Sequence, residues 1–194
     1  MKPLSEMSLE ELWNLFPVIL KEYNSACKDW YAEEKANLEK VIGTQYIRRI
    51  NHIGSSSIAG LIGKPIVDIL LEIDKDHDII EQLKKTLLDA GWLLMSSEIE
   101  PNLKISFNKG YTPNGFADKV YHLHVRHFGN WNELYFRDYL SDHEDVSIEY
   151  GNLKLSLLKE FEHNRDGYTD AKSDFINKYS KIAKQLYQNR YQTK

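Results

Sequence analysis

The chain has 194 residues, of which 42% are apolar and 28% charged, and its formal net charge is −4. These values are typical of one medium-sized globular domain, and the acidic balance argues against broad nucleic-acid binding while leaving room for a local basic pocket. A single cysteine, Cys27, excludes an intrachain disulfide, and no segment reaches the ~18 apolar residues of a membrane span. We therefore expect a cytoplasmic protein without membrane partners.

Short elements of both kinds alternate through the first part of the chain. A capping box at Ser8, with Glu11 three residues later, predicts a short helix. Apolar residues at helical spacing predict a helix over 25–42 that ends at Gly43. Strands are predicted for three apolar segments: Val18–Leu20, Tyr46–Ile53 and Ile66–Ile73. The last segment is apolar on both faces apart from two carboxylates, which is typical of a buried central strand.

The remaining chain predicts one more helix, three strands and a helical end. A helix is expected from Asp76 to Ala90, stopped by Gly91. Further strands are predicted at 92–96, 103–108 and 119–126, with a turn or mobile loop at 110–115. From Trp131 onward the spacing predicts about three helices. The fold class is therefore α+β: one domain over 1–194, with a mixed sheet and flanking helices in about 16–128 and a C-terminal helical region in about 130–189.

The turn Gly54-Ser55-Ser56 leads from an apolar strand into a small-residue loop. Its N–H groups and hydroxyls could hold phosphate oxygens, or the serines could simply cap a helix. Asp68 follows on the central strand, where a carboxylate is costly to bury without a partner. We interpret Asp68 as a ligand of a divalent metal beside the turn, or as the cap of a neighbouring helix. Glu72 shares its face but lies about 13 Å along the strand, so it is expected at the surface or as a support for the site.

A later strand carries His122, His124 and Arg126 on one face, with neighbours about 7 Å apart. Two such histidines can share a metal, or one can act as an acid or base beside a phosphate. His52, before the Gly-Ser turn, either lines the same pocket or completes a strand end. Basic residues of the predicted helices that could reach a ligand's phosphates are Arg137, Lys154, Arg165 and Lys172.

Several of these segments together closely resemble the signature of the GrpB-like family. The resembling segments are His52–Leu61, Lys64–Ile69, His122–Val125, Arg137–Leu140 and the pairs Tyr150/Lys154 and Tyr168/Lys172. The resemblance runs from about residue 46 to 183, and Ser56 stands where the family usually has threonine. It implies the fold of the nucleotidyltransferase superfamily typified by DNA polymerase beta. Relatives fused to dephospho-coenzyme A kinase suggest a nucleotide or coenzyme ligand, by association only.

In that superfamily a Gly-Ser turn precedes a strand with two alternating carboxylates, and a later strand supplies a third. Asp68 matches the first of these positions, but Leu70 stands at the second, and the later strand offers His122 and His124. The resemblance therefore implies the fold, but ordinary two-metal catalysis is not expected.

These observations predict a nucleotidyltransferase-like enzyme, or a descendant that still binds a nucleotide or phosphorylated metabolite. The predicted catalytic residues and metal ligands are Asp68, His122 and His124, holding Mg²⁺ or Mn²⁺, with Zn²⁺ as the alternative. The predicted phosphate-binding residues are Gly54, Ser55, Ser56, Arg126, Lys154 and Lys172. Two other functions stay open: a non-catalytic ligand-binding module, and a hydrolase with a single metal on the same three ligands.

Overall fold

The computed structural model describes residues 2–75, 78–188 and 190–192. A five-stranded sheet in the order β1-β2-β5-β4-β3 forms its centre. The strands are β1 (Ile47–Ile53), β2 (Val67–Ile73), β3 (Leu93–Glu98), β4 (Lys104–Thr112) and β5 (Gly115–His127). The sheet is mixed, because β2 and β5 pair in parallel while the other neighbours pair antiparallel. The predicted α+β class with a mixed sheet is confirmed.

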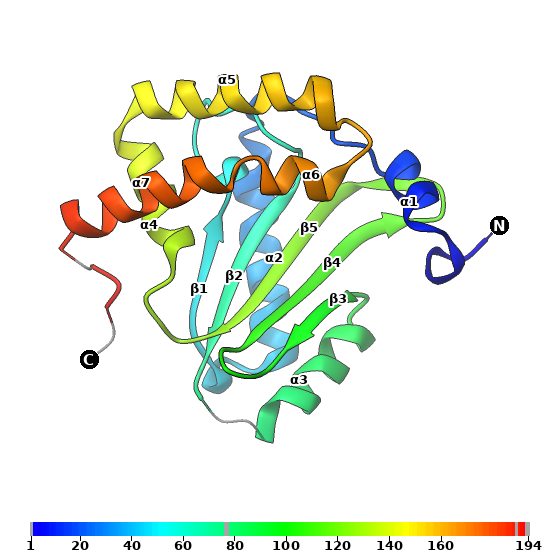
Figure 1. The fold of residues 1–194 in the computed structure, drawn as a ribbon. Helices are drawn as coiled ribbons and strands as arrows, with labels where there is room; N and C mark the ends of the chain where they lie inside the picture. Colours follow the sequence, from blue (N-terminus) through cyan, green and yellow to red (C-terminus); the bar gives the residue numbers. More distant parts are fainter. Residues whose placement is uncertain (1, 76–77, 189, 193–194) are drawn as a thin grey trace.

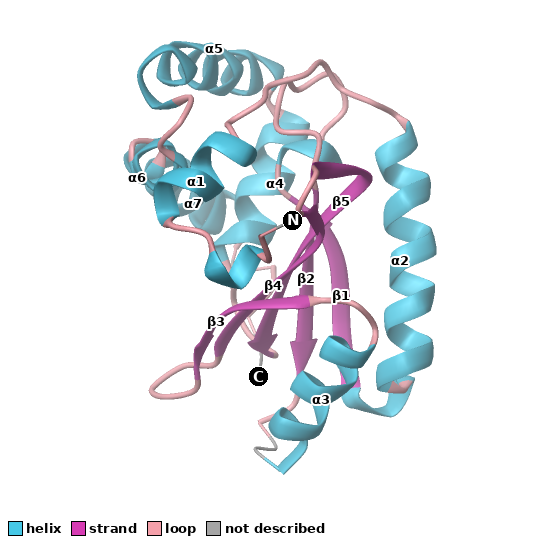
Figure 2. Ribbon diagram, turned by 90° about the vertical axis from the view of Figure 1, so that its right-hand side faces the viewer, coloured by secondary structure: helices cyan, strands magenta, loops and turns pink. Residues whose placement is uncertain are grey.

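Helices cover both faces of the sheet (Figures 1 and 2). One face carries α2 (Ala26–Ile42) and α3 (Asp78–Asp89), and the other carries α4 (Asn132–Asp142), α5 (Glu144–Phe161), α6 (Arg165–Asp170) and α7 (Ser173–Leu186). The short α1 (Leu9–Leu15) begins with the predicted capping box, and single 3-10 turns lie at Leu4–Glu6, Thr44–Tyr46 and Ser55–Ser57. None of the helices in the described ranges is long and apolar enough to cross a membrane.

Alternation along the strands separates a core face from a site face. Val67, Ile69 and Leu71 of β2 are fully buried, in one cluster with side chains of α2 and α3. Each such side chain contributes roughly 1.5–3 kcal/mol by leaving water. The intervening residues, Asp68 and Leu70 among them, face the C-terminal helices. The alternation of residues along each strand therefore decides which side chains can face the site.

Most predicted elements before residue 109 are present, but the strand at Val18–Leu20 is wrong. That segment has no regular structure. Val18 is buried, and its N–H donates to the carbonyl of Glu162 at the end of α5, while an isolated bridge joins Lys21 to Gly63. An apolar run can satisfy its backbone against a helix end as well as against a sheet. The predicted cap Asp76 lies outside the described residues.

Two predictions in the second half also need correction. The loop expected at 110–115 is mostly strand, because β4 continues to Thr112 and β5 starts at Gly115. Gly110 makes the bend possible: its φ is +88°, and a Cβ there would lie 2.3 Å from the carbonyl oxygen of Lys119. The C-terminal region has four helices in the described ranges, not about three, since Asn164 caps a separate α6 by accepting from the N–H of Gly167.

Candidate functional site

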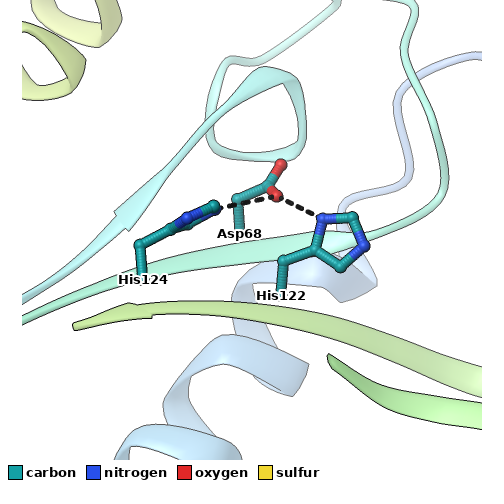
Figure 3. Close-up of side chains that lie close together, drawn as sticks. All are labelled: Asp68, His122 and His124. Carbon is teal, nitrogen blue, oxygen red and sulfur yellow. Dashed lines mark hydrogen bonds and ion pairs between the residues drawn. The ribbon is translucent and has the colours of Figure 1, made fainter. Parts of the chain in front are cut away.

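Neighbouring positions on β2 and β5 bring three possible metal ligands together. Asp68 is paired in register with His122, and His124 follows on the same face. Asp68 Oδ1 lies 3.1 Å from His122 Nδ1 and 3.9 Å from His124 Nε2 (Figure 3). One ligand atom from each residue lies within 4.8 Å of the other two. All three side chains are half-buried and line the same cleft.

The protonation of this cluster suits a cation. Burial alone would raise the pKa of Asp68, but the hydrogen bonds and charges of His122 and His124 lower it below its usual range. Burial lowers the pKa of His122, although the neighbouring carboxylate opposes that shift. An ionised carboxylate beside a neutral imidazole is the form of these groups that binds metals. Two ligands of a tetrahedral ion with bonds of about 2.1 Å lie roughly 3.4 Å apart, between the two separations observed here.

A hydrogen-bond chain behind His122 orients its ring. Tyr111 Oη lies 2.7 Å from His122 Nε2, and Arg165 Nη2 donates to Tyr111 Oη at 2.9 Å. Because ionised Asp68 can only accept, Nδ1 of His122 carries a proton, and a neutral ring must then accept the phenol proton at Nε2. Without a metal ion, Arg165 and Tyr111 therefore support the tautomer whose Nδ1–H faces Asp68. A metal ion on Nδ1 would take the place of that proton, and the Nε2–H of His122 would then donate to Tyr111 Oη.

The Gly-Ser turn packs directly against Asp68. Gly54 has a φ of +69°, and a Cβ at this position would lie 2.3 Å from Asp68 Oδ2. Only glycine lets the backbone adopt this conformation so close to the carboxylate. The turn continues as the single 3-10 turn Ser55–Ser57, and the next element is β2, so the serines do not cap an α-helix. Gly54 and Ser55 both line the cleft with Asp68.

Lys154 is a buried side chain that donates hydrogen bonds to the Gly-Ser turn and to the loop that follows it. This side chain is 2% exposed, and its Nζ donates to Ser55 Oγ at 2.9 Å and to the carbonyl of Ile62. An ammonium group can only donate, so the oxygen of Ser55 accepts, and its own hydroxyl proton is free for an acceptor in the cleft. Lys154 does not line the cleft in the described structure. Lys154 therefore reaches the lining of the cleft through its hydrogen bond to Ser55.

Lys172 and Lys64 are two of the cations that line the cleft with Asp68. Lys172 is 9% exposed, and its Nζ lies 4.3 Å from the centre of the Tyr168 ring. Lys64 approaches the same ring at 5.9 Å. Burial, reinforced by neighbouring cations, lowers the pKa of Lys172 and Lys154 to about 7 and that of Lys64 to about 8. Sequence reasoning missed Lys64, whose signal was its place at the start of the acidic strand within the family-like segment.

Three other side chains lie away from this cluster. Ser56 is buried with its Oγ 3.0 Å from His52 Nε2, and it lines a different hollow. The guanidinium of Arg126 donates to the carbonyls of Ile105 and Val125. Glu72 is fully buried and paired with Arg49, so its expected surface position is wrong. Of the predicted phosphate-binding residues in the described structure, Gly54, Ser55 and Lys172 line the cleft, whereas Ser56, Arg126 and Lys154 do not.

The cleft itself has a volume of about 920 Å³ and lies between the sheet and the C-terminal helices. Asp68, His122 and His124 form its sheet side, while Arg165, Thr169, Lys172 and Ile176 are among the residues on its helical side. This volume is sufficient for a nucleotide-sized ligand. A ligand in the cleft would therefore touch both layers of the molecule.

Comparisons with known proteins agree on one family. The model of the GrpB protein family matches residues 17–181. The glutamate-rich protein GrpB of Alkalihalophilus pseudofirmus is 33% identical over 162 residues, which cover 82% of this chain and 91% of that protein. The UPF0157 protein YqkA of Bacillus subtilis is 28% identical over 188 residues, 94% of this chain but only 52% of that protein. This chain thus spans about half the length of YqkA.

A solved structure of a GrpB protein is also similar to this chain. The crystal structure of the conserved protein GrpB from Enterococcus faecalis superposes with a TM-score of 0.76 at 28% identity, covering 88% of this chain and 99% of that chain. The structure of Cid1 in complex with its short product ApU has a TM-score of 0.44 at 15% identity, covering 79% of this chain and 44% of that chain.

Proposed function

Because the chain belongs to the GrpB family and gathers metal ligands, a Gly-Ser turn and buried cations in one cleft, we propose that it binds a nucleotide or phosphorylated metabolite together with a divalent metal ion. The proposed activity is that of a nucleotidyltransferase-like enzyme in the cytoplasm. A Gly-Ser turn lying against an acidic strand in a mixed sheet is the arrangement that the family resemblance implies.

One observation carries this proposal: cations and potential metal ligands share the same cleft. Lys64, Arg165 and Lys172 line it with Asp68, and the other carboxylates of its lining are the half-buried Glu133 and the exposed Asp166. Asp68 is the carboxylate whose charge acts on Lys64 and Lys172, and neither ammonium group has a hydrogen-bond acceptor among the described residues. Placing two such cations out of water beside one carboxylate is unfavourable unless further negative charge is supplied. Phosphate oxygens would supply that charge and accept hydrogen bonds from both ammonium groups.

Asp68, His122 and His124 are the residues that would hold the metal. One carboxylate and two imidazoles suit Zn²⁺ or Mn²⁺ better than Mg²⁺, which prefers oxygen ligands. When bound, the ion would supply Lewis-acid polarisation of a phosphoryl oxygen. The chain's own groups would position the ligand: the Ser55 hydroxyl donates to it, Gly54 allows its close approach, and Lys172 offsets its charge.

A non-catalytic binding module is the second candidate, and Leu70 is the observation that favours it. Leu70 occupies the position where the superfamily has a second carboxylate, and it is fully buried against Ile53 and Leu134. It cannot bind metal, and the helix α4 covers its place. The module would use the same cleft without turnover.

Calorimetry with ATP as the probe, with and without Zn²⁺ or Mn²⁺, tests the proposal. We expect metal-dependent ATP binding that weakens at least tenfold in Asp68→Asn and in Lys172→Met. Lys181→Met is the matched control, because Lys181 is exposed on α7 and lies outside the cleft, and it should bind as wild type does. ATP binding that is absent, or unchanged in both cleft variants, would contradict the proposal.

A turnover assay on the same variants separates the candidate functions. Pyrophosphate release from ATP that is lost in Asp68→Asn supports the transferase. Metal-dependent binding without any product supports the module. Inorganic phosphate release without an acceptor supports a single-metal hydrolase on the same ligands.

A further inference from the structure

A second hollow, which we call the Trp30 pocket, lies at the end of the sheet where α2 and β5 begin. Its volume is about 340 Å³. Its lining comes from the chain before α2 together with the first turns of α2, from the loop before β2 and from the start of β5, with Ser56 and Arg165 in addition. Ser56 lines this pocket while Gly54 and Ser55 line the cleft, so the 3-10 turn lies between the two hollows.

The walls of the Trp30 pocket are apolar. Cys27, Leu61, Ile66 and Val120 are each at most 4% exposed, and the half-buried Trp30 completes the wall. A hollow lined in this way favours an apolar body that leaves water on binding. The rim carries both signs of charge and therefore favours neither a cationic nor an anionic ligand. Its exposed charged residues are Lys21, Glu22 and Asp118.

The inner end of the pocket is positively charged. Lys64 and Arg165 line both the Trp30 pocket and the cleft. The guanidinium of Arg165 already donates to Phe16 and Tyr111, whereas the ammonium of Lys64 has no hydrogen-bond acceptor among the described residues. A half-buried cation without an acceptor is complementary to an anionic group that enters from the pocket.

We propose that the Trp30 pocket is a second ligand site for a small organic anion with an apolar body, whose charged group contacts Lys64. Such a molecule would meet the phosphate-bearing ligand of the cleft at Lys64 and Arg165. In this position the organic anion would be the second substrate of a reaction in the cleft. The role as second substrate rests on the proposed function, whereas the binding of an organic anion in the pocket does not.

Fluorescence titration with 8-anilinonaphthalene-1-sulfonate, an aromatic anion, tests the pocket on the full chain. We expect one saturable site that weakens at least tenfold in Ala117→Trp, since Ala117 lies exposed at the rim and a bulky side chain there blocks entry. Ala36→Trp is the matched control at an exposed position of α2 outside the pocket, and it should bind the probe as wild type does. Equal binding by the two variants would overturn the proposal.

The single cysteine reports where the probe binds. Cys27 lines the pocket and is the only cysteine of the chain, so the bound probe should slow its alkylation by N-ethylmaleimide several-fold in wild type and not in Ala117→Trp. An alkylation rate that the probe leaves unchanged in wild type would place the probe elsewhere and overturn the proposal.

The Asp68→Asn variant distinguishes failure of the pocket from failure of the cleft. This variant should keep the probe affinity, because Asp68 does not line the Trp30 pocket in the described structure. Loss of probe binding in Asp68→Asn would mean that the probe occupies the cleft, which contradicts the pocket site. If the probe binds as expected but ATP binds neither wild type nor any variant, the pocket proposal is supported and the proposed function is contradicted.

Discussion

His52 is a neutral imidazole held between an aromatic ring and a serine. Its ring stacks on Tyr31 at 4.9 Å between centroids, and its Nε2 lies 3.0 Å from Ser56 Oγ. Burial lowers the pKa of His52 from 6.5 to about 4, although the charge of Asp68 opposes that shift. The histidine therefore supports the Gly-Ser turn as a neutral hydrogen-bonding group, and its protonation would disturb that turn.

The depressed pKa of His52 predicts a loss of stability in mild acid. Unfolded His52 takes up a proton near pH 6.5 and the folded form only near pH 4, so the unfolded chain binds the extra proton in this window. Stability should fall as pH falls from 6.5 to 4, by at most about 3 kcal/mol from this residue. Urea unfolding of wild type and His52→Gln at pH 7.5 and 4.5 checks it, since the neutral amide should remove that share of the pH dependence.

His163→Gln is the matched control for this measurement, because it replaces an exposed histidine in the same way. The explanation fails if His52→Gln loses as much stability between the two pH values as wild type does.

At the scale of elements, the Gly-Ser turn depends on close contact between its backbone and strand β2. Gly54 and Gly60 both have positive φ, at +69° and +78°. Only Gly54 faces an obstacle, because a Cβ there would meet Asp68, while a Cβ at Gly60 would meet nothing within 4 Å. Substitutions at these two positions therefore distinguish the cost of backbone strain from the cost of steric contact.

Substituting these two glycines measures the contribution of the contact. We expect Gly60→Ala to cost about 1 kcal/mol from backbone strain alone. Gly54→Ala should cost about 1–3 kcal/mol more and should also weaken metal binding, because its methyl group displaces Asp68. Denaturant unfolding and metal calorimetry on both variants give the comparison. Equal losses in the two variants would show that the turn does not press on Asp68.

An ion pair links β1, β2 and the segment after β5. Arg49 donates to Glu72 at 2.5 and 2.7 Å and to the carbonyl of Gly129 at 2.7 Å, and the N–H of Gly129 donates back to Glu72. The side chain of Glu72 is fully buried. A carboxylate in this setting is tolerated only with its partners present. Glu72 thus holds strands together and plays no part in the cleft.

Removing one member of this pair should cost far more than removing both charges. Arg49→Met leaves Glu72 buried and unpaired, so we expect a loss of about 3–5 kcal/mol in the free energy of unfolding. The double variant Arg49→Met with Glu72→Gln should recover part of that loss. Chemical unfolding of wild type, the two single variants and the double variant measures the coupling, and additive effects would mean that the two charges do not interact.

At the scale of the whole molecule, the candidate site joins two layers. The proposed metal ligands Asp68, His122 and His124 belong to the sheet, and Lys172 and Arg165 belong to the C-terminal helical layer (Figure 1). Anything that binds only the folded arrangement stabilises it by mass action. Ligand binding should therefore be visible in global stability as well as in calorimetry.

Zinc provides the simplest global test. At a concentration of 100 times its dissociation constant, Zn²⁺ should add about 2.7 kcal/mol to the free energy of unfolding. For a chain of this size that corresponds to a Tm increase of roughly 5–10 °C. The increase should shrink as pH falls, since protonated histidines cannot bind metal. Thermal unfolding of wild type and Asp68→Asn checks it, and an equal increase in both would rule out these ligands.

Local sequence pattern was sufficient for most elements and for the direction of the side chains on β2 and β5. The period of two along 121–127 correctly separated His122 and His124 from the core residues Leu123 and Val125. The long amphipathic segment before Gly43 and the apolar run at β2 were equally clear, because strand and helix periodicity depend only on neighbouring residues. The GrpB family membership was likewise readable from contiguous motifs, and the comparisons confirm it.

Only the tertiary structure decided which of these side chains meet. The parallel pairing of β2 with β5 sets Asp68 beside His122, although 54 residues separate them. Packing of the C-terminal helices brought Lys172 into the cleft and left Lys154 beneath the turn. Ser56 instead contacts His52 of β1, and Arg126 donates to backbone carbonyls of the sheet. Strand periodicity determines only the face on which a side chain lies, whereas its neighbours across the sheet and beneath the helices follow from long-range packing.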